Sequence, residues 1–253
     1  MRIIINGKDY ETEKGDTILK VARRNNIYIP TLCHSDALPG LATCRFCIVE
    51  VIDGGESKVA ASCISPANPG NREIEVITDS DKIKRMRKVI AMLLQARCPD
   101  NQEVEKFAKA FGVEKRKVNR FKLEKGEDCA LCGLCVKACK AVGVGVLSLV
   151  NKGVYKKLDI SDGPTQKCIG CGACANVCPT NAIKIIDKDG QREIWENKFQ
   201  MVKCDYCGQY FITKEHIKYA YDKLEIEQPE KFYCNNCKRK IVAKSMNAIY
   251  EKV

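Results

Sequence analysis

Two stretches of this sequence share one cysteine pattern: Cys129-Ala-Leu-Cys132-Gly-Leu-Cys135-Val-Lys-Ala-Cys139 and Cys168-Ile-Gly-Cys171-Gly-Ala-Cys174-Ala-Asn-Val-Cys178-Pro179. The whole chain has 253 residues, with 17 cysteines and only 2 histidines. Cysteines at such short, fixed spacings indicate metal ligation rather than disulfides in a protein of a reducing compartment. All but one of the cysteines fall into four groups of four. Four thiolates are what a 2Fe–2S cluster, a 4Fe–4S cluster or a structural zinc ion requires.

The two matched runs predict a tandem 4Fe–4S ferredoxin-like module over residues 126–190. A glycine after the second cysteine of each run lets the backbone wrap closely around a cubane. Lys140 stands where the first run would normally have a proline, and we expect strands at Val144–Val150 and Ala182–Ile186 beside the clusters. In two-cluster ferredoxins the fourth cysteine of each run ligates the other cluster. One cluster should therefore use Cys129, Cys132, Cys135 and Cys178, and the other Cys168, Cys171, Cys174 and Cys139.

Residues 1–78 predict a β-grasp domain with a 2Fe–2S site in its loops. The Asn6-Gly7 pair favours a tight hairpin turn, and Asp16 or Thr17 can cap a helix. The elements that we expect are a hairpin of Ile3–Ile5 and Tyr10–Thr12, a helix at Ile18–Asn25, and strands at Cys47–Ile52, Lys58–Cys63 and Glu73–Thr78. The ligands of the 2Fe–2S cluster should be Cys33, Cys44, Cys47 and Cys63.

The spacing of these four ligands is wider at its start than in plant ferredoxins, because ten residues separate Cys33 from Cys44. This loop resembles the 2Fe–2S domain of the complex I large iron–sulfur subunit and of its hydrogenase relatives. His34 is expected to be a hydrogen-bonding neighbour, since a Rieske centre needs two histidines at one iron. Backbone N–H groups near the ligand pair should point at the sulfurs, from Gly40, Thr43, Arg45 and Phe46.

Residues 79–125 predict a helical linker. Ser80 suits an N-cap for a helix with Ile83, Met86, Ile90, Leu93 and Leu94 on its apolar face, and Asn101 suits the cap of a second helix that runs to Phe111 and ends at Gly112. Basic side chains are twice as numerous as acidic ones here, which fits a solvated face or a docking surface for an acidic protein. Cys98 belongs to no group of four, and we expect an ordinary buried thiol, the alternative being a vestigial or reactive residue.

Residues 191–253 predict a zinc ribbon and a C-terminal segment. Two Cys-x-x-Cys pairs at this separation suit a tetrahedral zinc ion held between two short hairpins. Rubredoxin-like iron and a 4Fe–4S cluster are the alternatives. We expect His216 on the surface, and a small aromatic core made by Tyr206, Tyr210, Phe211 and Phe232. The metal ligands would be Cys204, Cys207, Cys234 and Cys237.

Charge and hydropathy narrow the classes of partner. The formal net charge is +11, but sixteen bound thiolates and their metal ions would bring it to about +3. The apparent basicity is therefore weak support for nucleic-acid binding, and no nucleic-acid partner is expected. The start of the chain reads as a strand rather than a secretory signal, and no apolar stretch approaches the roughly 20 residues of a membrane span. We expect an α+β protein of the cytoplasm.

The order of domains over residues 1–190 resembles the N-terminal part of the complex I large iron–sulfur subunit and the diaphorase iron–sulfur subunit of NAD-linked hydrogenases. In these relatives the linker carries a further 4Fe–4S cluster held by one histidine and three cysteines. Here Arg97-Cys98-Pro99 stands where that motif would begin, and no cysteine or histidine follows before Cys129, so this cluster is predicted to be absent. The missing cluster and the added ribbon are most similar to the small iron–sulfur subunit of electron-bifurcating flavin oxidoreductases.

This resemblance implies partners that the cysteines alone do not. They are an NADH-binding flavoprotein subunit, a thioredoxin-like 2Fe–2S subunit, and a catalytic hydrogenase, formate or aldehyde oxidoreductase subunit or ferredoxin. The chain contains neither a dinucleotide fingerprint nor a P-loop, so we expect no catalysis by the chain alone. The sequence thus predicts an electron-transfer subunit of an NAD-linked oxidoreductase. The alternative is a redox-sensing or nucleic-acid-binding protein whose clusters report oxidation.

Overall fold

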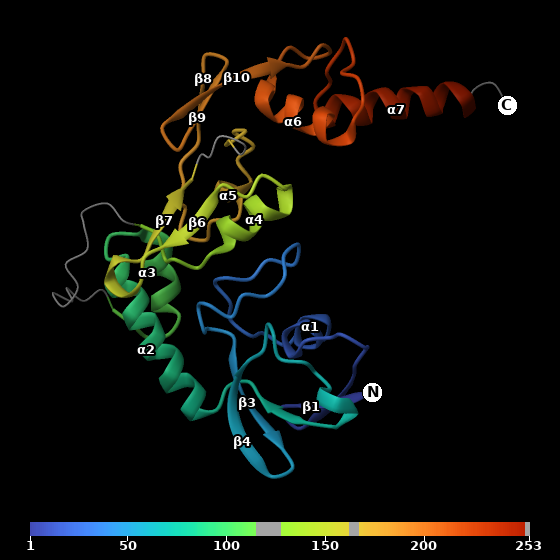
Figure 1. Cartoon of the computed structure of the whole chain (residues 1–253). Coiled ribbons are helices and arrows are strands. Elements are labelled where there is room, and N and C mark those ends of the chain that lie inside the picture. Colours follow the sequence, from blue (N-terminus) through green and yellow to red (C-terminus); the bar gives the residue numbers. More distant parts are fainter. Residues whose placement is uncertain (115–127, 162–166, 251–253) are drawn as a thin grey trace.

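The computed structural model describes residues 1–114, 128–161 and 167–250, and its α+β architecture is shown in Figure 1. The N-terminal sheet and the C-terminal helices lie at opposite ends of the molecule, with the paired cysteine runs between them. The part of the expected linker at 115–125 falls outside the described residues. None of the described helices is long and apolar enough to cross a membrane.

The N-terminal domain is a five-stranded sheet in the order β2-β1-β5-β3-β4, with β1 and β5 parallel and the other pairs antiparallel. Asn6 and Gly7 both have positive φ, as the predicted hairpin turn requires. Thr17 is the cap of α1, since its hydroxyl accepts from the Lys20 N–H. The elements are β1 (Arg2–Ile5), β2 (Lys8–Glu11), α1 (Ile18–Arg24), β3 (Ile48–Asp53), β4 (Glu56–Ala61), η1 (Pro69–Asn71) and β5 (Glu75–Ile77).

The linker forms two capped helices, α2 (Asp81–Arg97) and α3 (Gln102–Lys109), as predicted. Ser80 and Asn101 are their N-caps. The predicted apolar face of α2 is partly wrong, because Met86 and Leu93 are exposed while Arg87 is buried. Arg87 lies one turn from Ile83, and backbone carbonyls of the N-terminal domain hold its side chain inside.

The two cysteine runs lie in a small module whose elements are α4 (Leu134–Val142), β6 (Leu147–Val150), η2 (Gly153–Tyr155), β7 (Lys157–Ile160) and α5 (Ala173–Asn176). The prediction of a strand at Ala182–Ile186 is wrong. The partner of β6 is β7, which returns directly after the tight η2 turn and pairs antiparallel with it. The chain after the second run enters a sheet only at Ile186, where β8 begins.

The C-terminal part is a four-stranded sheet in the order β11-β10-β9-β8, followed by two helices. The predicted second hairpin is wrong, since Cys234 and Cys237 lie at the start of a helix. The predicted aromatic core is also wrong, because Tyr206 and Tyr210 are 50% and 44% exposed. The elements are β8 (Ile186–Lys188), β9 (Gln191–Ile194), β10 (Asn197–Lys203), β11 (Tyr210–Thr213), α6 (Lys214–Leu224) and α7 (Asn235–Tyr250).

Candidate metal centres

The four cysteines of the first group meet in the loops of the N-terminal domain as two pairs. The N–H of Cys33 donates to Sγ of Cys44 at 3.5 Å, and the N–H of Cys44 donates to Sγ of Cys33 at 3.3 Å. A hydrogen bond from the Cys33 thiol lowers the pKa of Cys44 to about 6, and one from Cys47 lowers the pKa of Cys63 to about 7. A 2Fe–2S cluster contains two iron ions that are each held by two thiolates, so two pairs of thiols form its donor set.

The loop that carries Cys44 is shaped to bring backbone N–H groups onto the sulfurs. The Phe46 N–H helps to lower the pKa of Cys44. The Cys44 thiol and burial raise the pKa of Cys33, and the Thr43 N–H offsets part of that rise, so two of the four predicted donors point at the sulfurs. A Cβ at Gly40 would collide with the carbonyl oxygen of Cys63, so only glycine fits there. Arg45 has a φ of 61°, a strained conformation for a residue with a side chain.

His34 follows Cys33 in the chain, and its Nε2 lies 3.2 Å from an Asp36 carboxylate oxygen. The hydrogen bond between His34 and Asp36, followed by the charge of Arg23, holds the pKa of Asp36 below its usual range. A hydrogen bond from His34 to the cluster stays a prediction.

Arg87 of α2 is a buried residue beside the first cysteine site that the sequence reasoning missed. Its Nε donates to the Phe46 carbonyl at 3.0 Å and its Nη2 to the Ile48 carbonyl at 2.7 Å. Phe46 and Ile48 are the residues on either side of Cys47. Arg87 is only 4% exposed. A buried guanidinium needs compensating negative charge: desolvation lowers the pKa of Arg87, and the Asp79 carboxylate, 3.4 Å from its Nη1, acts to raise it.

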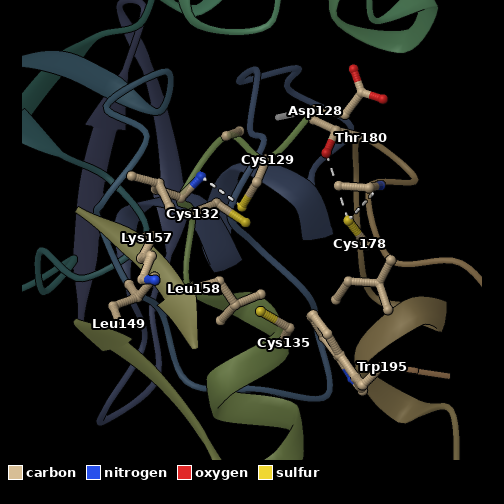
Figure 2. Close-up of a pocket in the computed structure, with 15 residues that line it drawn as sticks. Asp128, Cys129, Cys132, Cys135, Leu149, Lys157, Leu158, Cys178, Thr180 and Trp195 are labelled. Carbon is tan, nitrogen blue, oxygen red and sulfur yellow. Dashed lines mark hydrogen bonds between the residues drawn. The ribbon is translucent and has the colours of Figure 1, made fainter. Parts of the chain in front are cut away.

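The two matched runs surround two cavities. Cys129, Cys132, Cys135 and Cys178 line a cavity of about 220 Å³, and Figure 2 shows their side chains around it. A tighter cavity of about 20 Å³ is lined by Cys139, Cys168, Cys171 and Cys174. Each set joins three cysteines of one run to the fourth of the other.

These thiols are poorly placed to ionise without a cation. Burial raises the pKa of Cys132 to about 11 and the pKa of Cys135 to about 12, and neighbouring thiolates add to both effects. A bound metal cluster would supply the missing positive charge. A backbone donor already points at one of these thiols, since the Ala182 nitrogen lies 3.3 Å from Sγ of Cys178.

The first two sites adjoin each other. The charge of Cys44 contributes to the raised pKa of Cys132, although the two cysteines belong to different domains. Cys44 and Ala130 also pack against one shared core, which contains Phe46, Ala91, Leu94, Cys98, Val104, Ala108 and Val113. Cys98 is fully buried in this core at the end of α2, as expected of a packed thiol.

The helices α2 and α3 hold the second site from outside. The Nε of Arg97 donates to the Cys129 carbonyl at 2.8 Å, and the Nδ2 of Asn101 donates to the Thr180 carbonyl at 2.8 Å. Thr180 in turn lies 3.6 Å from Sγ of Cys178 through its hydroxyl. The same helix pair therefore contacts the loops of two cysteine sites.

The fourth group is far more compact. The Sγ atoms of Cys204, Cys207, Cys234 and Cys237 all lie within 4.8 Å of one another. Thiolates on a tetrahedral zinc ion are about 3.8 Å apart, so this set fits a single ion rather than a cubane. Burial acts to raise the pKa of Cys204, but backbone N–H groups outweigh it and lower the pKa to about 6. His216 is half-buried on α6 rather than on the surface as predicted, and it stands outside this set.

Comparison with known families agrees with this geometry. Residues 1–77 match the 2Fe-2S iron-sulfur cluster binding domain, and residues 165–184 match the 4Fe-4S binding domain. Both matched segments are therefore similar to iron–sulfur cluster binding domains. The predicted relationship to the iron–sulfur subunits of NAD-linked oxidoreductases is confirmed by the relatives that follow.

Two curated relatives are an NADH-quinone oxidoreductase subunit of Rhizobium meliloti, 28% identical over 82% of this chain, and the alpha subunit of the NADPH-Fe(3+) oxidoreductase of Geobacter sulfurreducens, 30% identical over 72%. The chain spans only 27% and 24% of their lengths. A crystal structure of an NAD+-reducing [NiFe]-hydrogenase in the H2-reduced state shares the fold, with a TM-score of 0.58 and 23% identity over 71% of this chain and 85% of that chain.

Proposed function

We propose that the chain is an electron-transfer subunit that relays single electrons between an NADH-binding flavoprotein subunit and a catalytic or ferredoxin-reactive module. The observation that carries this proposal is that the first two sites adjoin: Cys44 of the first group and Ala130, which follows Cys129 of the second, pack against one shared core. Iron–sulfur clusters, when bound, accept and donate one electron at a time. The chain's own contribution is to hold the sites in a buried row.

The ligand assignment within this proposal follows the thiol groups. A 2Fe–2S cluster would be held by Cys33, Cys44, Cys47 and Cys63, two 4Fe–4S clusters by the crossed sets around the two cavities, and zinc by the compact C-terminal group. Zinc is redox-silent, so the C-terminal unit would be structural. The electron route would therefore end at the set that contains Cys174.

The partners in this proposal come from the relatives and the resemblance. NADH-quinone oxidoreductase and NAD+-reducing hydrogenase among the similar proteins support an NADH flavoprotein as the electron donor. A thioredoxin-like 2Fe–2S subunit would accompany it, in the cytoplasm. The finer proposal is a complex that divides electron pairs from NADH between two acceptors, with a hydrogenase, formate or aldehyde oxidoreductase subunit, or ferredoxin, on the far side.

The test is anaerobic purification of the tagged chain from its native host. We expect a flavoprotein to co-purify, and NADH to bleach the visible absorption of the complex. The chain alone should be reduced by dithionite but not by NADH. Cys44→Ser should slow NADH-driven reduction of the 4Fe–4S sites. Cys98→Ser is the matched control, since Cys98 lies in the same core that Cys44 packs against.

Two results would overturn the proposal. One is NADH oxidation by the flavin-free chain, which would require a catalytic site in this chain. The other is purification with nucleic acid in place of a flavoprotein, together with a salt-dependent mobility shift, which would favour the redox-sensing alternative.

A further inference from the structure

The solvent face of α2 carries apolar side chains that a helix normally buries. Met86, Val89 and Leu93 recur at helical spacing, and they are 38%, 55% and 56% exposed. The opposite face of the helix is already occupied, since Ile83 and Ala91 are fully buried. α2 therefore has apolar side chains on two faces, and the described residues cover only one of them. A row of exposed apolar side chains on a helix is typical of a protein interaction site.

A groove runs beside this apolar row. Its larger part, of about 550 Å³, lies between α2 and the end of α3, and a smaller part of about 330 Å³ follows the chain just before the first cysteine site. Tyr28 lines both parts and is 81% exposed, so the two parts meet at its side chain. Arg85 and Lys88 line the groove and neighbour Met86 and Val89 along the helix. The groove and the apolar row of α2 thus form one continuous surface, the α2 surface.

The α2 surface is positively charged. Six of the 17 residues of α2 are basic and one is acidic. Lys84 and Arg87 share a single carboxylate, that of Asp79, which lies 3.4 Å from each of them. Arg85 and Lys88 are exposed and have no acidic partner among the residues that the structure describes. Because no cysteine lines the groove, the negative charge of bound thiolates would not neutralise it.

The floor of the groove leads to the first cysteine site. Phe111 lines the groove and packs on Phe46, with ring centroids 5.2 Å apart. Phe46 lies between Cys44 and Cys47 in the sequence and is 1% exposed. Arg87 also lines the groove and donates to the Phe46 carbonyl. A molecule seated in the groove would therefore lie one layer of side chains away from the loop that carries two of the expected 2Fe–2S ligands.

We propose that the α2 surface is the docking site for an acidic segment of the partner protein that exchanges electrons with the first cysteine site. Carboxylates of the segment would pair with Arg85 and Lys88, and its apolar side chains would cover Met86, Val89 and Leu93. Charge complementarity of this kind speeds association and fixes the orientation of the partner. This inference rests on the proposed function in that it requires a partner in electron transfer.

Other occupants fit the α2 surface less well. A twofold interface between two copies of this chain would bring the same patch of each copy together, so Arg85 and Lys88 would face their own counterparts. Nucleic acid would attract the cations, but its phosphate contacts are polar and leave the apolar row without a role. A membrane surface is flat, whereas these cations line a groove. An acidic protein segment satisfies the cations, the groove and the apolar row together.

The test is anaerobic purification of the full chain from its native host, with the affinity of the co-purified partner measured for variants. Arg85→Glu with Lys88→Glu should weaken binding about tenfold or more at low salt, and added salt should shrink the difference. Val89→Gln with Leu93→Gln should weaken binding in a way that salt does not remove. The matched control is Lys214→Glu with Lys218→Glu, which reverses two exposed lysines of α6 at the other end of the molecule from the N-terminal domain (Figure 1). All variants should keep the iron content and the EPR signals.

A cross-link locates the contact. Carbodiimide joins a lysine amine to a carboxylate, so mass spectrometry should find an amide between Lys84 or Lys88 and an acidic residue of the partner. The proposal is overturned if the Arg85 and Lys88 double variant keeps the partner as the α6 control does, if no protein partner co-purifies, or if these residues instead bind vesicles of anionic phospholipid or DNA. If a redox protein docks here but no flavoprotein co-purifies, the proposed function fails and this inference stands. If a flavoprotein co-purifies and no partner contacts the α2 surface, only this inference fails.

Discussion

Arg87 offers the sharpest test of how the linker supports the first cysteine site. Arg87→Met keeps the length and apolar stem of the side chain but removes the guanidinium that holds the peptides around Cys47. The carbonyls of Phe46 and Ile48 are then left without their donor, at 3.0 and 2.7 Å in the intact protein. An unsatisfied buried acceptor costs about 1–3 kcal/mol. Relief of the guanidinium's own desolvation offsets part of this, so the expected loss of stability is about 2–4 kcal/mol.

The assay is hydrogen exchange by mass spectrometry on the cluster-loaded protein. Amides of β3 and β4, which pair from Ile48–Ala61 to Asp53–Glu56, should exchange roughly 30- to 700-fold faster in Arg87→Met. Arg87→Lys keeps the positive charge but cannot donate to both carbonyls at once, so it should lose about half as much stability as Arg87→Met. Arg85→Met, exposed on the same helix, should change stability by less than about 0.5 kcal/mol.

The reduction potential of the 2Fe–2S cluster gives an independent test of Arg87→Met. Loss of a buried positive charge near Cys47 should lower the potential of the 2Fe–2S signal, because the reduced cluster is more negative. The reasoning is refuted if Arg87→Met behaves like Arg85→Met. It is also refuted if β8–β11 loses protection as much as β3 and β4, since the effect would then not be local to the first site.

Three further outcomes are expected. Anaerobically purified protein should contain about 10 Fe and 1 Zn per chain. A zinc chelator should abolish the protection of α6 and α7 against hydrogen exchange without removing iron. An iron content near 14 atoms per chain, or helices that stay protected after chelation, would contradict the assignment. Cys98→Ser should keep the iron content and every EPR signal, and loss of one 4Fe–4S signal would show that Cys98 is a ligand. Desolvation and then the charge of Arg192 lower the pKa of His216 from its usual 6.5, so the stability of the C-terminal unit should be full above about pH 6.5 and decline as the pH falls through the folded pKa. Thermal unfolding from pH 8 to 5.5 should show a flatter profile in His216→Gln, and an equal slope in both proteins would exclude His216 as the cause.

Local chemistry explains what the sequence could predict. A Cys-x-x-Cys pair, an Asn-Gly turn and a Ser or Asn cap each act within a few residues. The hairpin at Asn6-Gly7 and the caps Thr17, Ser80 and Asn101 are therefore found as expected. The four groups of cysteines were visible for the same reason. Strand partners depend on the path of the chain between elements, which is why no local signal identified β7 as the partner of β6.

The residues that sequence reasoning missed are those whose role is set by tertiary structure. Arg87 reads as a surface cation, yet its spacing from Ile83 and Ala91 puts it on the buried face of α2, where carbonyls beside Cys47 satisfy it. Trp195 reads as one aromatic residue after a strand. A Trp-Glu pair between two strand-like segments, where a turn demands positive φ, was the available signal. Both residues break a local rule beside a cysteine site: Arg87 donates to the carbonyls of the residues that flank Cys47, and Trp195 lines the cavities of Cys135 and Cys174. In this protein, residues that depart from local sequence rules therefore mark contacts next to the cysteine sites.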